Sequence, residues 1–331
     1  MKLLILCPGK IARSLKEIKC FTDVLNYYLP KSLSNIADTV IMQIPDVDNA
    51  QLKKLFSTVE VDKYDAIVTL GLRFYSKISK ETTALIRDRF SGIFCQVHDG
   101  SRLDHDPVDI TFTFKDDDGR LSENVGWHTR HKKFNAYMGW AADPKINTPA
   151  QIPTHLRILV DHTNYGDNEV DVTEEVLTQI KKFIVSEIWK TTYRSVSVRR
   201  FDSGKVVDVD FNNLKVKRYD RTAIPFSEIT KEHCAADIFC VTHPESVGLV
   251  VLETSMAGAL PLVPEGFIPK DRLKTIRHLE WVDTIDWRKV LARLDVKSSR
   301  TAALSNTWEA MAKRICDALQ TKLSEKGAQH D

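Results

Sequence analysis

Short runs of consecutive apolar residues alternate along the chain with longer segments in which apolar residues recur every three or four positions. Leu3–Cys7 is the first such run. It is closed by Pro8-Gly9, and a periodic segment from about Leu15 to Tyr28 follows it. An apolar run that ends in Pro-Gly predicts a buried strand, and the helical period predicts a helix. The chain therefore opens with a strand, a loop and a helix.

This unit recurs in the first 142 residues. Further strands are predicted at Asp38–Ile44, Tyr64–Leu70 and Gly92–Val97, with helical segments near 50–58 and 77–90. Strands that alternate with helices favour a parallel sheet covered by helices on both faces.

The pattern changes after Ala142. Residues 143–153 contain three prolines and show no apolar period, which is typical of a linker between domains. We expect a connector over residues 143–155.

A second α/β series begins at Leu156–Val160, which predicts a strand. Thr173 is expected to cap a helix whose apolar residues form a stripe with helical spacing. The residues of this stripe are Val176, Leu177, Ile180, Phe183, Ile184 and Ile188.

Further strands are predicted at Arg194–Val198, Asp237–Val241 and Leu260–Val263, and residues 245–257 read as a turn that enters a helix. The expected organisation is a Rossmann-like domain at 1–142, the connector at 143–155 and a second Rossmann-like domain at 156–301. A closing amphipathic helix at 302–323 and a polar tail at 324–331 complete it.

Length and composition agree with two domains. The 331 residues are 43% hydrophobic, which is enough for buried cores but more chain than one domain usually holds. The 47 basic and 45 acidic residues nearly cancel, so net charge does not indicate a nucleic-acid partner.

The six cysteines, at positions 7, 20, 95, 234, 240 and 316, lie mostly in apolar runs and form no C-x-x-C pair. This favours reduced, buried thiols and a reducing compartment. The first apolar run is too short for a signal peptide, and no stretch is long enough to span a bilayer. We therefore expect a soluble, cytoplasmic protein.

The segment 235–261 carries the most chemical information. A buried strand is expected to end near Thr242, a loop then presents Glu245, and Gly248 lets the chain turn closely into a helix whose second turn carries Glu253. The start of a helix offers free backbone N–H groups and a positive dipole end, which suit an anionic diphosphate. For each glutamate alone, a structural role is the commoner one: Glu245 as a first-turn acid and Glu253 as a solvated helix residue.

Taken together, the segment resembles the E-x7-E element of retaining GT-B glycosyltransferases of the glycosyltransferase group 1 type. The resemblance includes Ala235-Ala-Asp-Ile-Phe239, the two glutamates seven residues apart, and Gly258-Ala-Leu-Pro261. It implies a GT-B fold, in which two Rossmann-like doubly wound domains face each other across a cleft.

The resemblance also implies roles for these residues. Glu253 would accept hydrogen bonds from the ribose hydroxyls of a nucleotide sugar, and Glu245 would contact the donor sugar as a catalytic-site residue. The backbone N–H groups of Val247, Gly248 and Leu249 would face the diphosphate or the sugar.

A second polar cluster follows the apolar run in Phe94–Gly100, at a sheet edge where ligands bind in open α/β sheets. A histidine there is more often a hydrogen-bonded loop residue. The resemblance implies that His98 lies close to the reacting sugar carbon, with Asp99 shaping its turn on the acceptor side. Pro107–Thr113 and Tyr137–Asp143 match further parts of the first domain, although Met138 and Ala142 depart from the usual residues of that turn.

The diphosphate site matches less well. Related enzymes place an arginine and a lysine near the first strand of the second domain, whereas this chain has the loop 161–167 there. His162 is one candidate substitute, and Arg199, Arg200 and Lys205 from the next loop are others. Each is as well explained as a solvated surface charge.

On the acceptor side, Gly9 and Lys10 follow the first strand and Arg13 comes shortly after, while Arg73 follows the third strand at the same sheet edge. A tight turn and a solvated helix face explain these residues too. The functional alternative is that these basic residues bind an anionic acceptor, such as a phosphorylated lipid, a charged glycan or a nucleic acid.

Motifs of other enzyme classes are missing from the sequence: no G-x-G-x-x-G follows the first strand, and there is no P-loop, H-E-x-x-H or G-x-S-x-G. The remaining alternative is a non-catalytic two-domain protein that binds a sugar or nucleotide.

The expected function is transfer of a sugar from a nucleotide-diphosphate sugar to a hydroxyl on a glycan, lipid-linked glycan or modified nucleic acid. Transfer is expected to retain the configuration of the sugar and to need no metal or other cofactor. Any membrane or nucleic-acid contact is expected to be peripheral.

Overall fold

Two compact units make up the chain in the computed structural model. The structure describes residues 1–8, 11–18, 21–44, 49–70, 80–97, 109–113, 135–161, 170–202, 205–212, 224–244 and 248–328. Unit 1 comprises Met1–Gly139 together with Trp308–Asp331, and unit 2 comprises Trp140–Thr307. The chain therefore passes between the units twice.

Unit 1 is built on a six-stranded sheet in the order β2-β1-β3-β4-β5-β6, in which every neighbouring pair is parallel. The strands are β1 (Lys2–Pro8), β2 (Asp38–Ile44), β3 (Ala66–Leu70), β4 (Ile93–Val97), β5 (Ile110–Thr113) and β6 (Asn135–Tyr137). These pairings confirm the predicted parallel sheet. Strands β3 and β4 bury every residue, as expected of strands that are covered on both faces.

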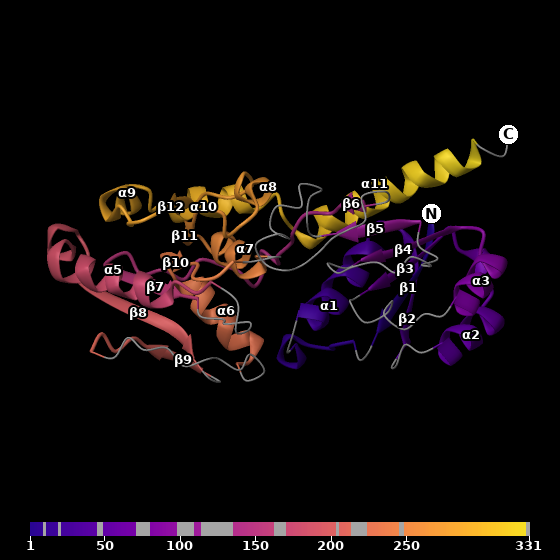
Figure 1. The fold of residues 1–331 in the computed structure, drawn as a ribbon, viewed down its shortest axis with the longest axis horizontal. Coiled ribbons are helices and arrows are strands. Elements are labelled where there is room, and N and C mark those ends of the chain that lie inside the picture. The colour runs from indigo at the N-terminus through magenta and orange to yellow at the C-terminus, as the bar shows by residue number, and fades with distance from the viewer. Residues whose placement is uncertain are drawn as a thin grey trace. The chain divides into compact units, whose positions relative to one another are not determined.

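Helices cover both faces of this sheet, with α1 on one side of the strands and α2 and α3 on the other (Figure 1). The helices of unit 1 are α1 (Phe21–Ser34), α2 (Asn49–Thr58), α3 (Lys80–Arg89) and α11 (Trp308–Gly327), with short 3-10 turns η1 (Leu15–Glu17) and η2 (Val61–Lys63). The helix predicted at about 15–28 is therefore a 3-10 turn followed by α1. Helix α1 continues past Pro30 because Leu29 and Leu33 on either side of it are buried in the core.

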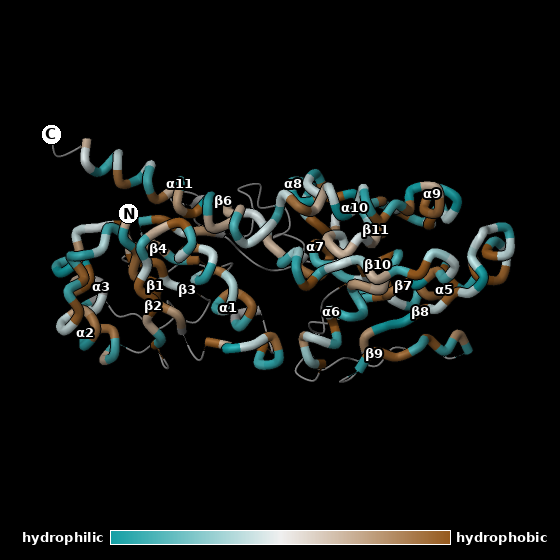
Figure 2. The backbone as a smooth tube through the Cα atoms, turned by 180° about the vertical axis from the view of Figure 1, so that it is seen from behind, coloured by the Kyte–Doolittle hydropathy of each residue, from teal (hydrophilic) through white to brown (hydrophobic). Residues whose placement is uncertain are grey.

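Helix α11 differs in extent from the predicted closing helix at 302–323. It begins at Trp308 and belongs to unit 1, where the ring of Trp308 stacks on Tyr28 of α1 with centroids 5.3 Å apart. Hydrophilic and hydrophobic residues alternate along it (Figure 2), and its buried residues recur at helical spacing. Residues 302 and 303 instead end a separate helix of unit 2, α10 (Val296–Ala303).

Unit 2 contains a second six-stranded sheet, in the order β12-β11-β10-β7-β8-β9. Its strands are β7 (His155–Val160), β8 (Ser195–Asp202), β9 (Lys205–Asp208), β10 (Ile238–Cys240), β11 (Leu260–Pro264) and β12 (Leu279–Trp281). All neighbours are parallel except the edge strand β9, which pairs antiparallel with β8.

Helices also cover both faces of the second sheet. They are α5 (Thr173–Ser186), α6 (Phe226–Ala235), α7 (Leu249–Met256), α8 (Lys270–Leu273), α9 (Trp287–Ala292) and α10, with the 3-10 turn η3 (Ile188–Lys190). One core cluster joins the sheet to α5 and α9, where Phe183 stacks on Trp287 at 4.4 Å, and the other joins it to α7, α8 and α10.

The apolar stripe predicted for α5 is confirmed, but Thr173 is not its cap. Thr173 is the first helical residue, and the Asp171 carboxylate accepts hydrogen bonds from its backbone N–H at 2.8 Å and from its hydroxyl at 2.5 Å. An aspartate just before a helix takes over the capping role because its carboxylate satisfies donors of the first turn.

The expected connector, residues 143–155, is packed as part of unit 2, and the units divide earlier, after Gly139. The Arg300 side chain donates to the carbonyls of Pro144 and Asn147, and the Gln151 amide donates to the carbonyl of Ala236 at 2.8 Å. Prolines remove backbone donors but leave carbonyl acceptors, and here Arg300 satisfies two of those acceptors while Gln151 ties the segment to Ala236.

The described cysteines are free and buried, as the sequence predicts: Cys7, Cys95, Cys234, Cys240 and Cys316. Burial raises the pKa of the Cys7 thiol to about 12, which keeps it protonated and unreactive. Among the described residues, no helix combines the length and the apolar character needed to cross a membrane.

Candidate functional site

The strand order of unit 2 changes direction between β10 and β7. From β7 the chain moves to β8 on one side, and it later places β10 on the other side of β7. Loops that leave two such strands diverge, and the crevice that opens at their carboxyl ends is where open α/β sheets bind ligands. The residues just after β7 and β10 are therefore the first candidates for a site.

Three buried polar residues occupy this position. Asp161 directly follows β7, and Thr242 and His243 come shortly after β10. The Thr242 hydroxyl donates to the carbonyl of Asp161, and Nδ1 of His243 lies 3.9 Å from the Asp161 carboxylate. Sequence reasoning missed Asp161 and His243, although both stand where an apolar run ends, the signal that led us to His98.

Helix α7 is the next helix after β10 and begins immediately after Gly248, as predicted. Gly248 has φ +68° and ψ +27°, in the left-handed region, and a Cβ atom added there would lie 3.3 Å from Cζ3 of Trp140. Only glycine fits such a turn without strain. Glu245 and Val247 lie outside the described residues, and the side chain of Leu249 packs partly buried against the adjacent core.

Glu253 lies in the second turn of α7 and is only 7% exposed. The helix around it is buried on nearly all sides, from Val251 to Met256. The interpretation of Glu253 as a solvated helix residue is therefore wrong. A carboxylate in this setting loses hydration, which costs free energy unless a partner compensates.

His233 faces this carboxylate from a neighbouring helix. It lies in the last turn of α6, is fully buried, and places Nδ1 3.4 Å from Oε2 of Glu253. The rings of Phe201 and Phe239 also border it in T-shaped arrangements, with centroids at 6.1 and 6.3 Å. Nothing in the sequence pattern singled out His233, because a histidine near the end of an amphipathic helix has no distinctive spacing.

Two of the candidate cations for a diphosphate, Arg199 and Arg200, lie on β8. Arg199 is engaged on β8: it donates to the Glu232 carboxylate of α6 and to the Val206 carbonyl at 3.2 Å, and Nε lies 3.5 Å from Asp208. Arg200 is the next residue along the strand, so its side chain points to the opposite face of the sheet. The structure thus brings these two arginines to different faces.

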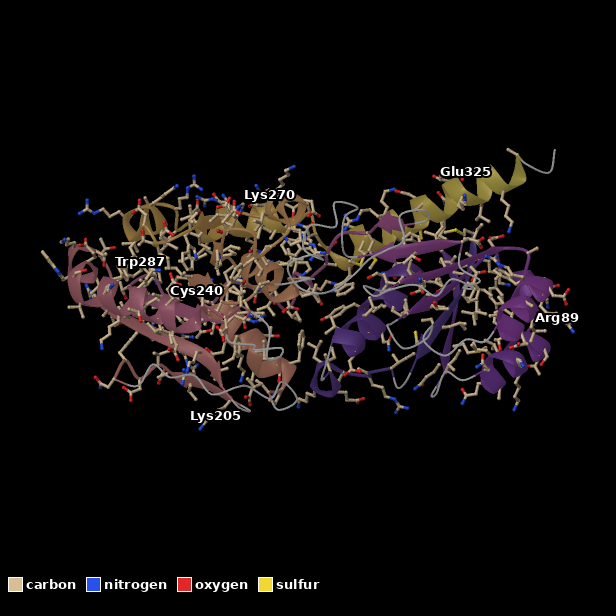
Figure 3. The ribbon with its side chains drawn as sticks, viewed as in Figure 1. Arg89, Lys205, Cys240, Lys270, Trp287 and Glu325 are labelled. Carbon is tan, nitrogen blue, oxygen red and sulfur yellow. The ribbon has the colours of Figure 1, made fainter. Side chains whose placement is uncertain are left out.

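Lys205 begins the edge strand β9 and is exposed at the periphery of unit 2, whereas Cys240 lies inside it (Figure 3). His162 lies outside the described residues. Within the described ranges, no three His, Cys, Asp or Glu side chains gather as a metal site would require. The expected independence of a metal stays a prediction.

Unit 1 has a similar change of direction between β1 and β3. The loops that leave these strands are residues 9–10 and 71–79, so Gly9, Lys10 and Arg73 lie outside the described residues. The same holds for His98 and Asp99 after β4. Arg13 is described and exposed, and its backbone N–H donates to the Glu17 carboxylate at 3.4 Å.

No family model matches the sequence, and a search of curated proteins finds no relative. Among solved structures, the chain is similar to an alpha,alpha-trehalose-phosphate synthase (UDP-forming) from Burkholderia vietnamiensis. The TM-score is 0.51 at 10% sequence identity, over 97% of this chain and 98% of that one. It is also similar to a UDP-N-acetylglucosamine 2-epimerase at 11% identity over 95% of this chain and 90% of that one, with a TM-score of 0.41.

The similarity to the synthase confirms the predicted GT-B fold of two Rossmann-like domains. At 10% identity this similarity shows the fold alone, and one fold supports many functions, so the function is inferred from the residues of the site.

Proposed function

We propose that this protein is a glycosyltransferase that moves a sugar from a nucleotide-diphosphate sugar to a hydroxyl acceptor. The observation that carries the proposal is the position of Glu253: a nearly buried carboxylate on the helix that follows β10, next to the change of direction in the strand order. A protein gains nothing in stability from burying a carboxylate there, whereas a ligand with hydroxyl groups gains an acceptor.

The start of α7 supplies the complementary feature. The first N–H groups of a helix have no acceptor within it, and at the start of α7 the backbone N–H of Leu252 donates to the carbonyl of Gly248 at 3.2 Å. In the proposal, the N–H groups of the first turn bind an anion at the positive end of the helix dipole. A nucleotide sugar has both parts, a diphosphate for these groups and ribose hydroxyls for Glu253.

The fold supports the same proposal. The solved structure of similar fold is described as a UDP-forming synthase, and a nucleoside diphosphate is the product expected when a sugar leaves a nucleotide-diphosphate donor. In the proposal Glu245 contacts the donor sugar and His98 lies near the reacting carbon. Transfer proceeds with retention and without a metal, and the leaving diphosphate accepts the acceptor's proton.

In the proposal, cations act on both the donor and the acceptor. Arg199 is held by two carboxylates, so its role is structural. Arg200, His162 and Lys205 are the candidate cations for the diphosphate. The acceptor is a hydroxyl compound, which Lys10, Arg13 and Arg73 would favour in anionic form.

The test is turnover of a panel of UDP-, ADP- and GDP-sugars by the purified chain, followed as release of the nucleoside diphosphate. Glu253→Gln keeps the size of the side chain and removes its charge. A hydrogen bond to a charged group contributes about 1.5–3 kcal/mol, so we expect kcat/KM to fall by roughly 10- to 100-fold at an unchanged melting temperature.

Glu280→Gln is the matched control. Glu280 belongs to a second histidine-glutamate pair, with Nε2 of His278 3.9 Å away, but it lies exposed on β12. Its replacement should leave turnover unchanged. The proposal fails if no donor in the panel is consumed, or if Glu253→Gln turns over at the wild-type rate. Binding of a nucleotide sugar without any turnover would instead indicate a binding protein.

A further inference from the structure

We propose that His233 is a positioning residue, which holds the Glu253 carboxylate in the orientation that binds the ribose hydroxyls of the nucleotide. The inference rests on the proposed function and adds to it a residue on another helix. His233 itself does not touch the ligand, because its side chain is fully buried.

Among the described residues, the Glu253 carboxylate is the charged group that faces the His233 ring. Nδ1 lies 3.4 Å from Oε2 of Glu253, and within the described part of the chain neither ring nitrogen has a hydrogen bond. The edges of Phe201 and Phe239 border the ring and offer no acceptor. A buried imidazole that faces a carboxylate is best satisfied by a bond to it.

The residues on either side of His233 are already engaged. Glu232 accepts a hydrogen bond from Arg199, and the Cys234 thiol donates to the carbonyl of Ile146 at 3.3 Å. Neither side chain is therefore placed to replace Glu253 as the partner of the imidazole.

The opposite end of the pair is accessible. The Glu253 side chain keeps 9% of its surface exposed, whereas His233 keeps none. A carboxylate has about four lone-pair positions, so Oε2 can accept from His233 while the carboxylate still accepts from ligand hydroxyls.

Such bonds are often long in a free protein and shorten in the complex, which is consistent with the 3.4 Å separation. Holding the carboxylate before the ligand arrives reduces the ordering that binding must bring about. The predicted consequence is selectivity for ribose over deoxyribose.

The experiment measures dissociation constants of UDP, ADP and GDP, each beside its 2′-deoxy form, by calorimetry. For the tightest-binding of the three, we expect the wild-type protein to prefer the ribonucleotide by about tenfold or more. Each such tenfold step corresponds to about 1.4 kcal/mol. His233→Phe should weaken the ribonucleotide about tenfold, leave the 2′-deoxy form nearly unchanged, and so abolish the preference.

Three further variants complete the design. His233→Gln keeps a donor and should restore most of the preference, and Glu253→Gln should lose the preference as His233→Phe does. The double variant should lose no more than Glu253→Gln alone, because both act through one contact. His278→Phe, in the exposed pair with Glu280, is the control and should bind as the wild type does.

A purely structural role for His233 would weaken both forms of the nucleotide equally, and that result overturns the inference while leaving the proposed function intact. A preference retained in His233→Phe overturns it as well. If His233→Phe does not fold, His233→Met is used in its place, since a flexible side chain fills the same space with less strain. If the wild-type protein binds none of the three nucleotides, the proposed function fails and the inference fails with it.

Discussion

At Gly248 the backbone conformation and the packing make separate demands on one residue. The φ of +68° lies in the left-handed region, where a side chain costs about 1–2 kcal/mol. The position also faces the ring of Trp140, which is buried and donates from its indole N–H to the Thr275 hydroxyl at 3.0 Å. The ring is therefore poorly placed to move aside.

Gly248→Ala should lower the melting temperature of unit 2 more than Gly266→Ala does. Gly266 has a similar φ of +82°, but a Cβ atom there would meet no atom within 4 Å. The decrease in melting temperature of Gly266→Ala therefore measures backbone strain alone. The additional decrease in Gly248→Ala measures the cost of the contact with Trp140. Thermal unfolding of both variants tests this, and equal shifts would contradict the contact.

The positions of individual candidate residues in the fold were predictable from sequence only where their spacing along the chain carries information. Gly248 and Glu253 stand at fixed positions in a strand-turn-helix pattern, and the resemblance to E-x7-E enzymes identified both. His233 and Asp161 were not predictable, because their proximity to Glu253 and His243 comes from pairing of distant elements. Such contacts have no signature in a single sequence.

Helix α7 is held at both of its ends by the segment through which the chain enters unit 2. Trp140 packs on Gly248 at the start of the helix. At its other end the Arg300 side chain donates to the carbonyl of Met256, and it also donates to Pro144 and Asn147 of the entering segment. The element that carries Glu253 is thereby tied to residues 140–147.

Arg300→Met should loosen this arrangement locally. It leaves buried carbonyls at Asn147 and Met256 without their charged donor, which costs about 2–4 kcal/mol. We expect faster hydrogen exchange in residues 144–151 and in α7, with no change in α5, measured by mass spectrometry.

Lys313→Met is the control for this variant. Lys313 forms an exposed ion pair with Asp317 on α11, at 3.0 Å, and exposed pairs contribute about 0–1 kcal/mol. Its exchange pattern should match that of the wild-type protein. Uniformly faster exchange across unit 2 in Arg300→Met would show that Arg300 supports the whole unit and not α7 in particular.

Elements with a long, continuous apolar run were predictable, and those without one were not. The hydrophobic pattern gives β2 at Asp38–Ile44 and comes within one residue of the bounds of β7. Strands β9 and β12 escaped prediction because they are short edge strands, and β9 leaves all of its residues at least partly exposed. Their pairing, more than their composition, makes them strands.

At the scale of the whole molecule, two parallel sheets with helices on both faces were predictable from the alternation of patterns. The division of the chain was harder to predict. Residues 143–155 have the composition of a linker, yet the carbonyls of Pro144 and Asn147 accept from Arg300 within unit 2, and α11 at the end of the chain returns to unit 1. The proline-rich composition of this segment indicates that it forms no helix or strand. It does not indicate which part of the protein the segment packs against.

The central claim is that a nucleotide occupies the site formed by α7 and Glu253 in unit 2. The most direct measurement is a crystal structure of the protein with the nucleoside diphosphate that it binds most tightly. The account predicts that the ribose hydroxyls lie within hydrogen-bonding distance of the Glu253 carboxylate and that the diphosphate lies at the start of α7. A nucleotide bound elsewhere, with Glu253 in contact only with His233, would contradict it.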